Sequence, residues 1–418
     1  MGRTQSWDVI VIGGGPAGSS TAALTSMQGR RILLLEKERF PRFRIGESFM
    51  PATWWSFEKL GITGKLKTSH FQRKHSVQFY LKDGRATSPF FFSEVDPRES
   101  SATWQVDRGE FDKLMLEHAA EKGVEVIQEA VVQEVLFDGS RAIGVRANLP
   151  GEGQVEIGAR VIVDATGQAA FLSQTLKLKN YDAKLKNAAV FTRFEGALRD
   201  PGLHEGATLV IHTDNESAWF WYIPLAGGVV SVGVVGPMDY IIKGRSGDPQ
   251  KIFDEEVARC PGLLPRLTSA RQVAGIRVLR DFSYISRKIA GDGWVLVGDA
   301  FGFLDPIYSS GVLLALKGGE MASDSIASAF ETGDFSGARL GRHGPRFVEG
   351  MEALRHLVYA FYAPDFHFKK FLDKYPEGRD GITNLLTGNA FTYQANGLFR
   401  QMDQMLRLED YRPLSLGE

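Results

Sequence analysis

The chain has 418 residues, of which 43% are hydrophobic and 24% are charged, so we expect a folded globular protein with a large core rather than a disordered one. Its formal net charge of −1 gives no reason to expect nucleic-acid binding, which needs an excess or a stripe of basic residues. Cys260 is the only cysteine, which excludes an intramolecular disulfide or a cysteine metal cluster and favours a cytoplasmic protein; we expect no metal, no membrane span and no signal segment.

The first elements of the chain predict a strand, a tight turn, a helix and a second strand. In residues 8–12 every position after Asp8 is apolar and β-branched, and after three glycines a helical pattern runs from Pro16 to about Met27. A second apolar run, residues 31–35, ends at Glu36 and completes a βαβ unit. Such a unit commonly binds a dinucleotide.

The glycines at this turn form the pattern G-x-G-x-x-G. The first supports the turn, the second lets a diphosphate approach the backbone, and the third lets the helix pack closely on the strand, while the helix N-terminus stabilises the phosphate charge. The acidic residue 23 positions after the first glycine is near the ~20 expected for a ribose-binding carboxylate. The cofactor-binding residues predicted here are Gly13, Gly15, Pro16, Ala17, Gly18, Glu36 and Lys37.

Further along the chain, the pattern changes twice. Helical and strand-like segments continue to about residue 184, and short strands with period-2 stretches then predict an antiparallel sheet. An apolar strand and a long helix afterwards return to the first architecture, so the nucleotide-binding domain is predicted to be discontinuous. We expect that domain in residues 1–184 and 286–332, a sheet domain in 185–285 and a helical C-terminal region in 333–418. The other expected elements are helices at 111–122 and 311–332 and strands at 124–128, 155–164, 207–212, 219–224, 229–235 and 294–297.

A second motif lies near residue 300 and distinguishes between nucleotides. Gly298-Asp299-Ala300, Asp305-Pro306 and Ser310-Gly311 resemble the second flavin motif of the FAD-dependent monooxygenase fold. That resemblance implies that Asp299 contacts the ribityl chain and that the helix start faces the isoalloxazine. Other matches to the fold lie earlier, and an arginine among them could hold the diphosphate through charge-assisted hydrogen bonds. The FAD-binding residues implied are Arg44, Ile45, Gly46, Glu47, Ser48, Arg108, Asp299, Pro306, Gly311 and Val312.

Residues 219–224 read Trp-Phe-Trp-Tyr-Ile-Pro, a W-x-W-x-I-P hexad. Alone, such a pattern usually lines one buried face of a strand. Together with both nucleotide motifs, it makes roughly the first 330 residues resemble the flavin-dependent halogenases. The resemblance implies an α/β fold: a Rossmann-like FAD-binding domain of the aromatic-hydroxylase and halogenase type, an inserted antiparallel-sheet domain and a helical C-terminal region. It also implies that Trp219 and Trp221 keep organic substrate away from the flavin.

Lys74 aligns with the lysine that receives hypohalous acid in that family and directs the halogen to substrate. Burial would lower its pKa toward reactivity. His75 and Ser76 follow it where the family often has a glycine. By itself, the lysine would more often be a solvated charge in a basic loop, and only together with the hexad does the catalytic interpretation become the favoured one.

Ser310 and Gly311 align with the pair whose backbone N–H groups hold the halide, and a helix start offers such unpaired donors. Two positions before Ser310, tryptophan-specific members of the family carry a glutamate that acts as a base, whereas this chain has Tyr308. This departure argues against free tryptophan as the substrate.

The implied activity is a halogenase in natural-product biosynthesis that uses reduced FAD (FADH2), oxygen and chloride or bromide. A separate flavin reductase is expected, because no second nucleotide fingerprint is visible. The acceptor is expected to be a phenol, a pyrrole or an activated carbon, possibly tethered to an acyl or peptidyl carrier protein. Aromatic residues of the tail would cap the tunnel, and a basic face would dock an acidic carrier; the basic residues considered are Arg342, Arg346, Arg355, Lys369, Lys370 and Lys374.

Three other readings stay open from the sequence. An aromatic hydroxylase would insert oxygen without halide, and a geranylgeranyl-type reductase, which shares the fold, would need no oxygen. A non-catalytic flavin-binding partner protein would bind FAD without turnover. The acceptor, the halogenated position, the halide and the oligomeric state are not determined by the sequence.

Overall fold

The first sheet is mainly parallel and has the strand-turn-helix at its centre, in a computed structural model that describes residues 7–406 and 414–417. β1 (Trp7–Ile12) pairs in parallel with β2 (Ile32–Glu36) on one side and with β10 (Gly153–Asp164) on the other. The chain order therefore reverses between β1 and β10, and open α/β sheets bind ligands at the carboxyl ends of the strands at such a point. β7 (Glu125–Gln128), β18 (Trp294–Leu296) and β17 (Ala290–Gly291) complete the order β17-β18-β10-β1-β2-β7.

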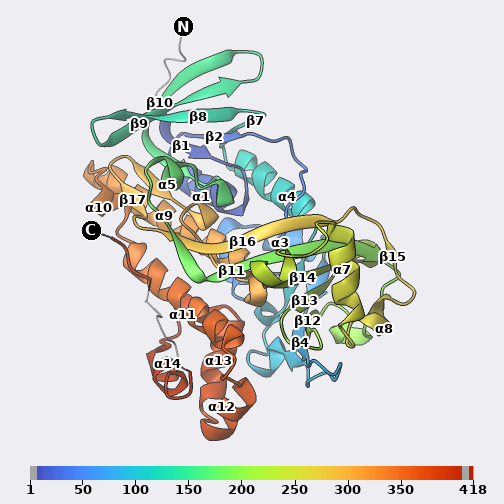
Figure 1. Ribbon diagram of the computed structural model, residues 1–418. Coiled ribbons are helices and arrows are strands. Elements are labelled where there is room, and N and C mark those ends of the chain that lie inside the picture. Colours follow the sequence, from blue (N-terminus) through green and yellow to red (C-terminus); the bar gives the residue numbers. More distant parts are fainter. Residues whose placement is uncertain (1–6, 407–413, 418) are drawn as a thin grey trace.

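Helix α1 (Pro16–Met27) packs between α4 (Arg108–Glu121) and α9 (Gly311–Thr332). Small residues permit the close crossing of α1 and α9, since a Cβ atom added at Gly319 would lie 2.6 Å from Ser20 Oγ. β8 (Val131–Asp138) and β9 (Arg141–Leu149) extend β10 into an antiparallel sheet at the top of Figure 1. The short helices nearby are α2 (Thr53–Leu60), α3 (Thr63–Lys67) and α5 (Phe171–Thr175).

The second sheet is mostly antiparallel and has the order β19-β16-β11-β14-β13-β12-β4-β5, with β15 paired to β11. One face, with Trp219 and Trp221, packs into the main core, while the other, with Phe220 and Tyr222, packs under small helices. The strict alternation of strand side chains explains this division of the hexad. The strands are β4 (Ser76–Tyr80), β5 (Phe90–Phe91), β11 (Lys179–Glu195), β12 (Thr208–His212), β13 (Trp219–Pro224), β14 (Val229–Pro237), β15 (Arg271–Gln272), β16 (Arg277–Ser286) and β19 (Gly302–Phe303); the small helices are α6 (Met238–Ile241), α7 (Pro249–Ala258) and α8 (Leu264–Leu267).

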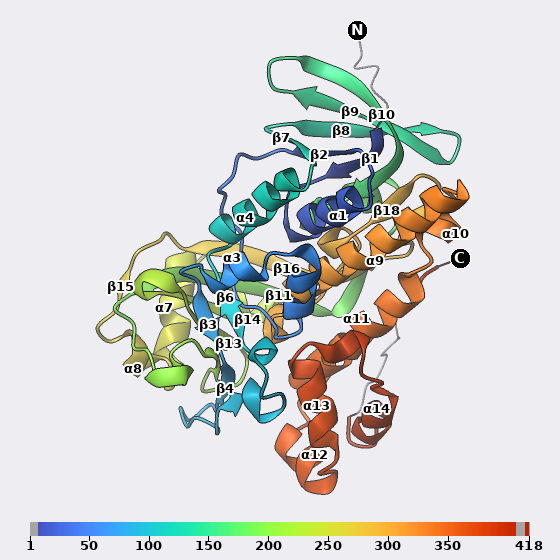
Figure 2. The same ribbon diagram turned by 180° about the vertical axis from the view of Figure 1, so that it is seen from behind.

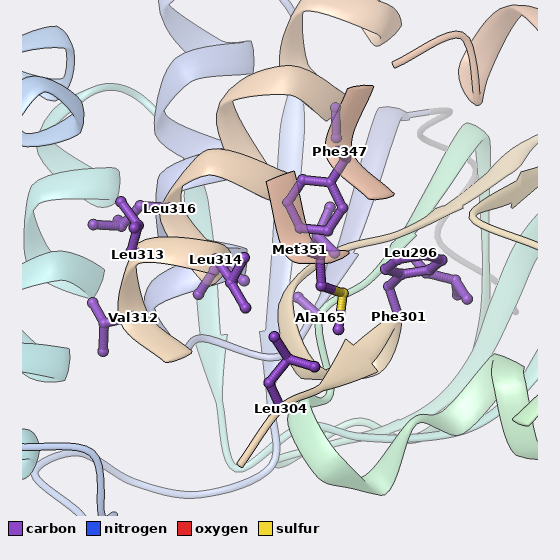
Figure 3. Packing of buried hydrophobic residues seen from close by; sticks show 14 of the residues in the cluster. Ala165, Leu296, Phe301, Leu304, Val312, Leu313, Leu314, Leu316, Phe347 and Met351 are labelled. Carbon is purple, nitrogen blue, oxygen red and sulfur yellow. The ribbon is translucent and has the colours of Figure 1, made fainter. Parts of the chain in front are cut away.

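Helices form the C-terminal region, drawn in orange and red in Figures 1 and 2. α11 (Gly344–Tyr362) runs from the parallel sheet toward the second sheet, and its side chains Phe347 and Met351 pack near Phe301 and Leu304 (Figure 3). The remaining helices are α10 (Gly337–Leu340), α12 (Phe368–Lys374), α13 (Gly378–Leu386) and α14 (Asn396–Met402). Among the residues that the structure describes, no helix is both long and apolar enough to cross a membrane.

The predicted fold class is confirmed, and two features were not anticipated. The antiparallel sheet takes β4 from the first segment of the chain, through a parallel pairing with β12 that sequence spacing does not signal. A two-stranded ribbon of β3 (Gln72–Lys74) and β6 (Thr103–Gln105) also lies outside the two sheets. Strand β11 begins at Lys179, so the expected boundary at residues 184 and 185 falls inside a strand; the four domain ranges remain a proposal.

Candidate active site

The glycine-rich turn has the geometry that a bound diphosphate would need. Gly13 has φ +105°, and a Cβ atom there would lie 2.5 Å from the Ala165 carbonyl oxygen. A Cβ atom on Gly18 would lie 1.9 Å from the Gly13 carbonyl oxygen, so only glycine allows this contact between helix and turn. At Gly15 the nearest atom would be 3.6 Å away, which leaves the backbone approachable.

Helix α1 begins without a side-chain cap and with no acidic residue in its first turn. Its free N–H groups and positive end are therefore available to an anion. Pro16 and Ala17, at the start of the helix, are buried. Glu36 is also buried, and its carboxylate accepts hydrogen bonds from Gly14 N (2.7 Å) and Glu38 N (2.8 Å), so it braces the turn; Lys37 is exposed.

Arg108 contacts the segment Arg44–Ser48 through its backbone carbonyl oxygens. Its guanidinium donates to the Ile45 carbonyl oxygen at 2.7 Å and pairs with Asp112, with Nε 2.8 Å from Oδ1. Gly46 has φ +98° and a Cβ atom there would meet Arg108 at 2.8 Å. The charge of Arg108 is thus already balanced, while Arg44 is partly exposed and pairs with Glu38. Of the two arginines considered for the diphosphate, Arg44 is the more accessible.

The acid of the second motif is electrostatically coupled to this segment. Burial raises the pKa of Asp299 to about 6, although Arg108 and Lys179 favour its charged form. Tyr284 donates a hydrogen bond of 2.6 Å to the Asp299 carbonyl oxygen, which fixes the turn. Asp299 and Arg108, far apart in sequence, are therefore close enough to interact electrostatically, while their contacts with a flavin stay a prediction.

Lys74 is not a solvated charge, because only 4% of its surface is exposed. Its Nζ donates to Ser48 Oγ at 2.9 Å and to the Phe49 carbonyl oxygen at 3.0 Å, and both partners are neutral. Ser48 Oγ in turn lies 2.9 Å from Thr208 Oγ1 of strand β12. Burial without a carboxylate partner lowers the pKa of Lys74 to about 7.

The two hexad tryptophans are buried and point to the same side of β13. Trp219 Nε1 donates to the Tyr362 hydroxyl at 2.9 Å, and Trp221 Nε1 donates to Ser231 Oγ at 3.1 Å. Ser231 also lies beside the Glu47 carboxyl. Burial raises the pKa of that carboxyl above its ordinary value, although Arg193 and Ser231 partly offset the rise. Glu47 therefore faces the hexad, while Ser48 faces Lys74.

The proposed halide donors lie at the start of α9. Ser310 is buried as the N-cap, Gly311 is exposed, and a Cβ atom on Gly311 would meet nothing within 4 Å. The helix has neither a side-chain cap nor an acidic residue in its first turn, so its N–H groups suit an anion. Val312 is buried in the core (Figure 3), and Pro306 begins the short 3-10 turn before the helix.

Tyr308 is buried and donates a hydrogen bond of 3.2 Å to the Leu357 carbonyl oxygen of α11. Burial raises its pKa above the ordinary range, so its hydroxyl is not a base at neutral pH. The position that would carry a base therefore supports α11 instead.

The expected basic face of the tail is not formed by all six residues. Arg355 is buried, and its Nη2 lies 2.8 Å from Asp182 Oδ2 of β11. Arg342 is exposed and donates to Ser328 Oγ at 2.8 Å. Lys369, Lys370 and Lys374 are exposed on α12, together with Asp373. Charge in the sequence does not reveal which cations have buried partners.

Several contacts of the site come from residues that motif matching missed. Thr208 contacts the partner of Lys74, Ser231 contacts Trp221, and Tyr362 contacts Trp219. Each pairs with a motif residue through the fold, so no local pattern identifies it. No group of three metal-ligating side chains that could hold an ion is found in residues 7–406 and 414–417.

Comparison with known proteins gives consistent results. The family model described as tryptophan halogenase matches residues 8–100 and 91–367. A flavin-dependent halogenase of Armillaria mellea is 34% identical, covering 78% of this chain and 68% of the relative. A 1H-pyrrole-2-carbonyl-[peptidyl-carrier protein] chlorinase of Pseudomonas fluorescens is 29% identical, covering 97% of this chain and 94% of the relative. The solved structure of the flavin-dependent brominase Bmp2 superposes with a TM-score of 0.86 at 29% identity, covering 96% and 98% of the two chains.

Proposed function

The chain belongs to the flavin-dependent halogenases, and we propose that it halogenates an electron-rich ring on a carrier protein, with Lys74 delivering the halogen. The observation that carries this proposal is the state of Lys74: a buried lysine, bound only to neutral oxygens, with a pKa of about 7. A lysine kept for stability would be expected to have a carboxylate partner. The hydroxylase, reductase and non-catalytic readings are set aside because the family is a halogenase family.

The residues of the proposed cofactor site fit FAD. The glycine turn leaves room at Gly15 and an uncapped helix start for the diphosphate, and the partly exposed Arg44 could supply a charge-assisted hydrogen bond to it. Asp299 would hold the ribityl chain, and the start of α9 would face the ring system. Reduced FAD, when bound, supplies two electrons to oxygen for the oxidation of halide.

Chloride or bromide would be held by the N–H groups of Ser310 and Gly311, which point from an uncapped helix start. Trp219 and Trp221 would exclude the organic acceptor from this place by their bulk. A small halide could then be oxidised to hypohalous acid where the acceptor cannot enter.

Lys74 would act on the hypohalous acid as a neutral amine. The N–halogen bond forms as the halogen–oxygen bond breaks, and the departing hydroxide takes a proton from the amine to give water. The acceptor carbon then attacks the halogen, the electron pair of the N–halogen bond returns to nitrogen, and the nitrogen takes up a proton as the ring loses one, which restores the neutral amine. Ser48 and the Phe49 carbonyl oxygen would hold the amine in place for both steps.

Two partners complete the proposal. The Pseudomonas fluorescens relative, named for a substrate on a peptidyl carrier protein, matches this chain over nearly its whole length, which supports a carrier-bound acceptor here. Tyr308 in place of a base argues against free tryptophan. A separate flavin reductase would supply reduced FAD.

Mass spectrometry tests the proposal directly. Purified protein is combined with FAD, a flavin reductase, NADH, oxygen and bromide, and is offered pyrrole-2-carbonyl or a phenolic acyl group on a carrier protein. A bromide-dependent mass gain on the carrier-bound group is expected. Incorporation of oxygen without halogen would instead establish a hydroxylase. Halogenation of only the free acids would show that the acceptor is not bound to a carrier protein.

A further inference from the structure

The last turn of α11 is hydrogen-bonded both to the hexad and to the turn that precedes α9. Trp219 Nε1 donates to the Tyr362 hydroxyl at 2.9 Å, and that hydroxyl donates to Asp305 Oδ2 at 3.0 Å. Asn187 Nδ2 donates to the same oxygen at 2.6 Å, and Ile307 N donates to Asp305 Oδ1 at 3.1 Å. Asp305 is buried, so these bonds replace its hydration.

The direction of this chain of bonds is fixed by chemistry. An indole nitrogen can only donate, so Tyr362 must accept from Trp219 and use its own proton for Asp305. The Tyr362 hydroxyl therefore links the indole of Trp219 to the Asp305 carboxylate. Removing its hydroxyl would leave Trp219 Nε1 and Asp305 Oδ2 each short of one partner.

A second set of contacts places the same end of α11 against the 305–310 turn. Tyr308 donates to the Leu357 carbonyl oxygen at 3.2 Å, and its ring lies 6.3 Å from that of Phe361 between centroids. Phe361 also lies 6.2 Å from Trp219 in an edge arrangement. Within the 305–310 turn, Ser309 lies in the left-handed region, with φ +59°, immediately before the N-cap of α9. A displacement of this turn would thus move the N–H groups at the helix start.

We infer that Tyr362 is a positioning residue that orients Trp219 and, through Asp305, the turn that presents the halide donors. The inference rests on the proposed halide site and on the proposed role of the hexad. Helix α11 of the C-terminal region would then set the geometry of the oxidation site, although it contributes no residue to the sequence motifs. The two branches are separable: one leads to Trp219, and the other leads to Asp305 and the start of α9.

The test compares three single substitutions. Tyr362→Phe keeps the ring and removes both branches. Trp219→Phe removes only the first branch, because Tyr362 can still donate to Asp305. Tyr359→Phe is the matched control: it removes a buried hydroxyl from the same helix, but that hydroxyl bonds Asp182 of β11 and not the hexad.

Two measurements report separately on the branch to Asp305 and the start of α9 and on the branch to Trp219. Halide affinity is obtained from the bromide concentration that suppresses peroxide release during oxidation of reduced FAD, which needs no organic acceptor. The environment of Trp219 is read by 19F NMR of the FAD-free protein containing 5-fluorotryptophan, with the Trp219 signal identified by its loss in Trp219→Phe. Thermal unfolding of every variant shows whether a change is merely structural.

The expected result is a split pattern. Tyr362→Phe raises the bromide requirement by about tenfold, the equivalent of one hydrogen bond to a charged group, and shifts the Trp219 signal. Trp219→Phe raises the bromide requirement less than Tyr362→Phe does, because Tyr362 still donates to Asp305. Tyr359→Phe changes neither reading.

Two outcomes overturn the inference: unchanged bromide requirement and Trp219 signal in Tyr362→Phe, or equal effects from Tyr359→Phe, which would indicate general anchoring of α11. Failure of the proposed function looks different. In that case bromide would not suppress peroxide release in the wild-type protein, and no hypohalous acid would be trapped by a general scavenger. Suppression by bromide in the wild type together with an unaltered Tyr362→Phe variant would reject only the positioning role.

Discussion

Replacing Lys74 with methionine should stabilise the FAD-free protein at low pH, because the site holds an amine where a charge is unfavourable. Burial lowers the pKa of Lys74 from 10.5 to about 7. Below pH 7 the amine is protonated in both the folded and unfolded states, so the full burial penalty is present, about 5 kcal/mol for this difference in pKa. Methionine removes that penalty but loses two hydrogen bonds, worth about 1 kcal/mol each.

The net gain in the free energy of unfolding at about pH 6 is therefore about 3 kcal/mol. Between pH 7 and 10.5 the unfolded state binds more protons than the folded state, so the wild-type protein gains stability as the pH rises. At about pH 9.5 the penalty has fallen to about 1.4 kcal/mol, less than the lost hydrogen bonds, and the methionine variant should be no more stable than the wild type.

Urea unfolding at both pH values measures these differences, and Lys74→Arg serves as the control that keeps the charge. A methionine variant that is less stable than the wild type by the same amount at both pH values would refute the reasoning. That result would mean that the buried amine already has its ordinary pKa.

Three further outcomes are expected. Gly15→Ala should leave the free energy of unfolding unchanged within about 0.5 kcal/mol but weaken FAD binding, which is measured by flavin fluorescence. Gly18→Ala should instead lower the free energy of unfolding by about 1 to 3 kcal/mol, because its Cβ atom would lie 1.9 Å from a carbonyl oxygen. Gly233→Ala should displace the Trp221 indole, whose Cζ2 would lie 2.3 Å from the new Cβ atom, and should raise the ratio of peroxide to halogenated product. An unchanged ratio would count against the proposed role of the hexad tryptophans in excluding the acceptor. Halogenation at saturating substrates should rise with pH through about 7 as Lys74 becomes neutral, and a rate that falls over this range would indicate that the ammonium form acts.

Local patterns were sufficient for the elements that carry the motifs. The observed helix Pro16–Met27 and strand Trp219–Pro224 have the bounds that were expected, because glycine turns and side-chain alternation act over a few residues. The long helix Gly311–Thr332 is likewise as expected, since its apolar pattern is bounded by glycine at both ends.

Long-range contacts set the rest, and the sequence holds no local sign of them. The parallel pairing of β4 with β12 places Thr208 next to Ser48, beside Lys74, although the two are 160 positions apart. Tyr362 bonds Trp219 across 143 positions, and Arg355 is neutralised by Asp182 rather than exposed on a basic face. Such pairings depend on how whole elements pack, so composition and spacing do not identify them.

The most direct test of the central claim compares the wild-type protein with Lys74→Ala in the carrier-bound halogenation assay, with consumption of reduced FAD followed in parallel. Lys74→Ala should bind FAD and consume reduced FAD and bromide as the wild type does, yet give no bromide-dependent mass gain on the acceptor. A Lys74→Ala protein that binds FAD and halogenates the acceptor at the wild-type rate would contradict the role assigned to this lysine.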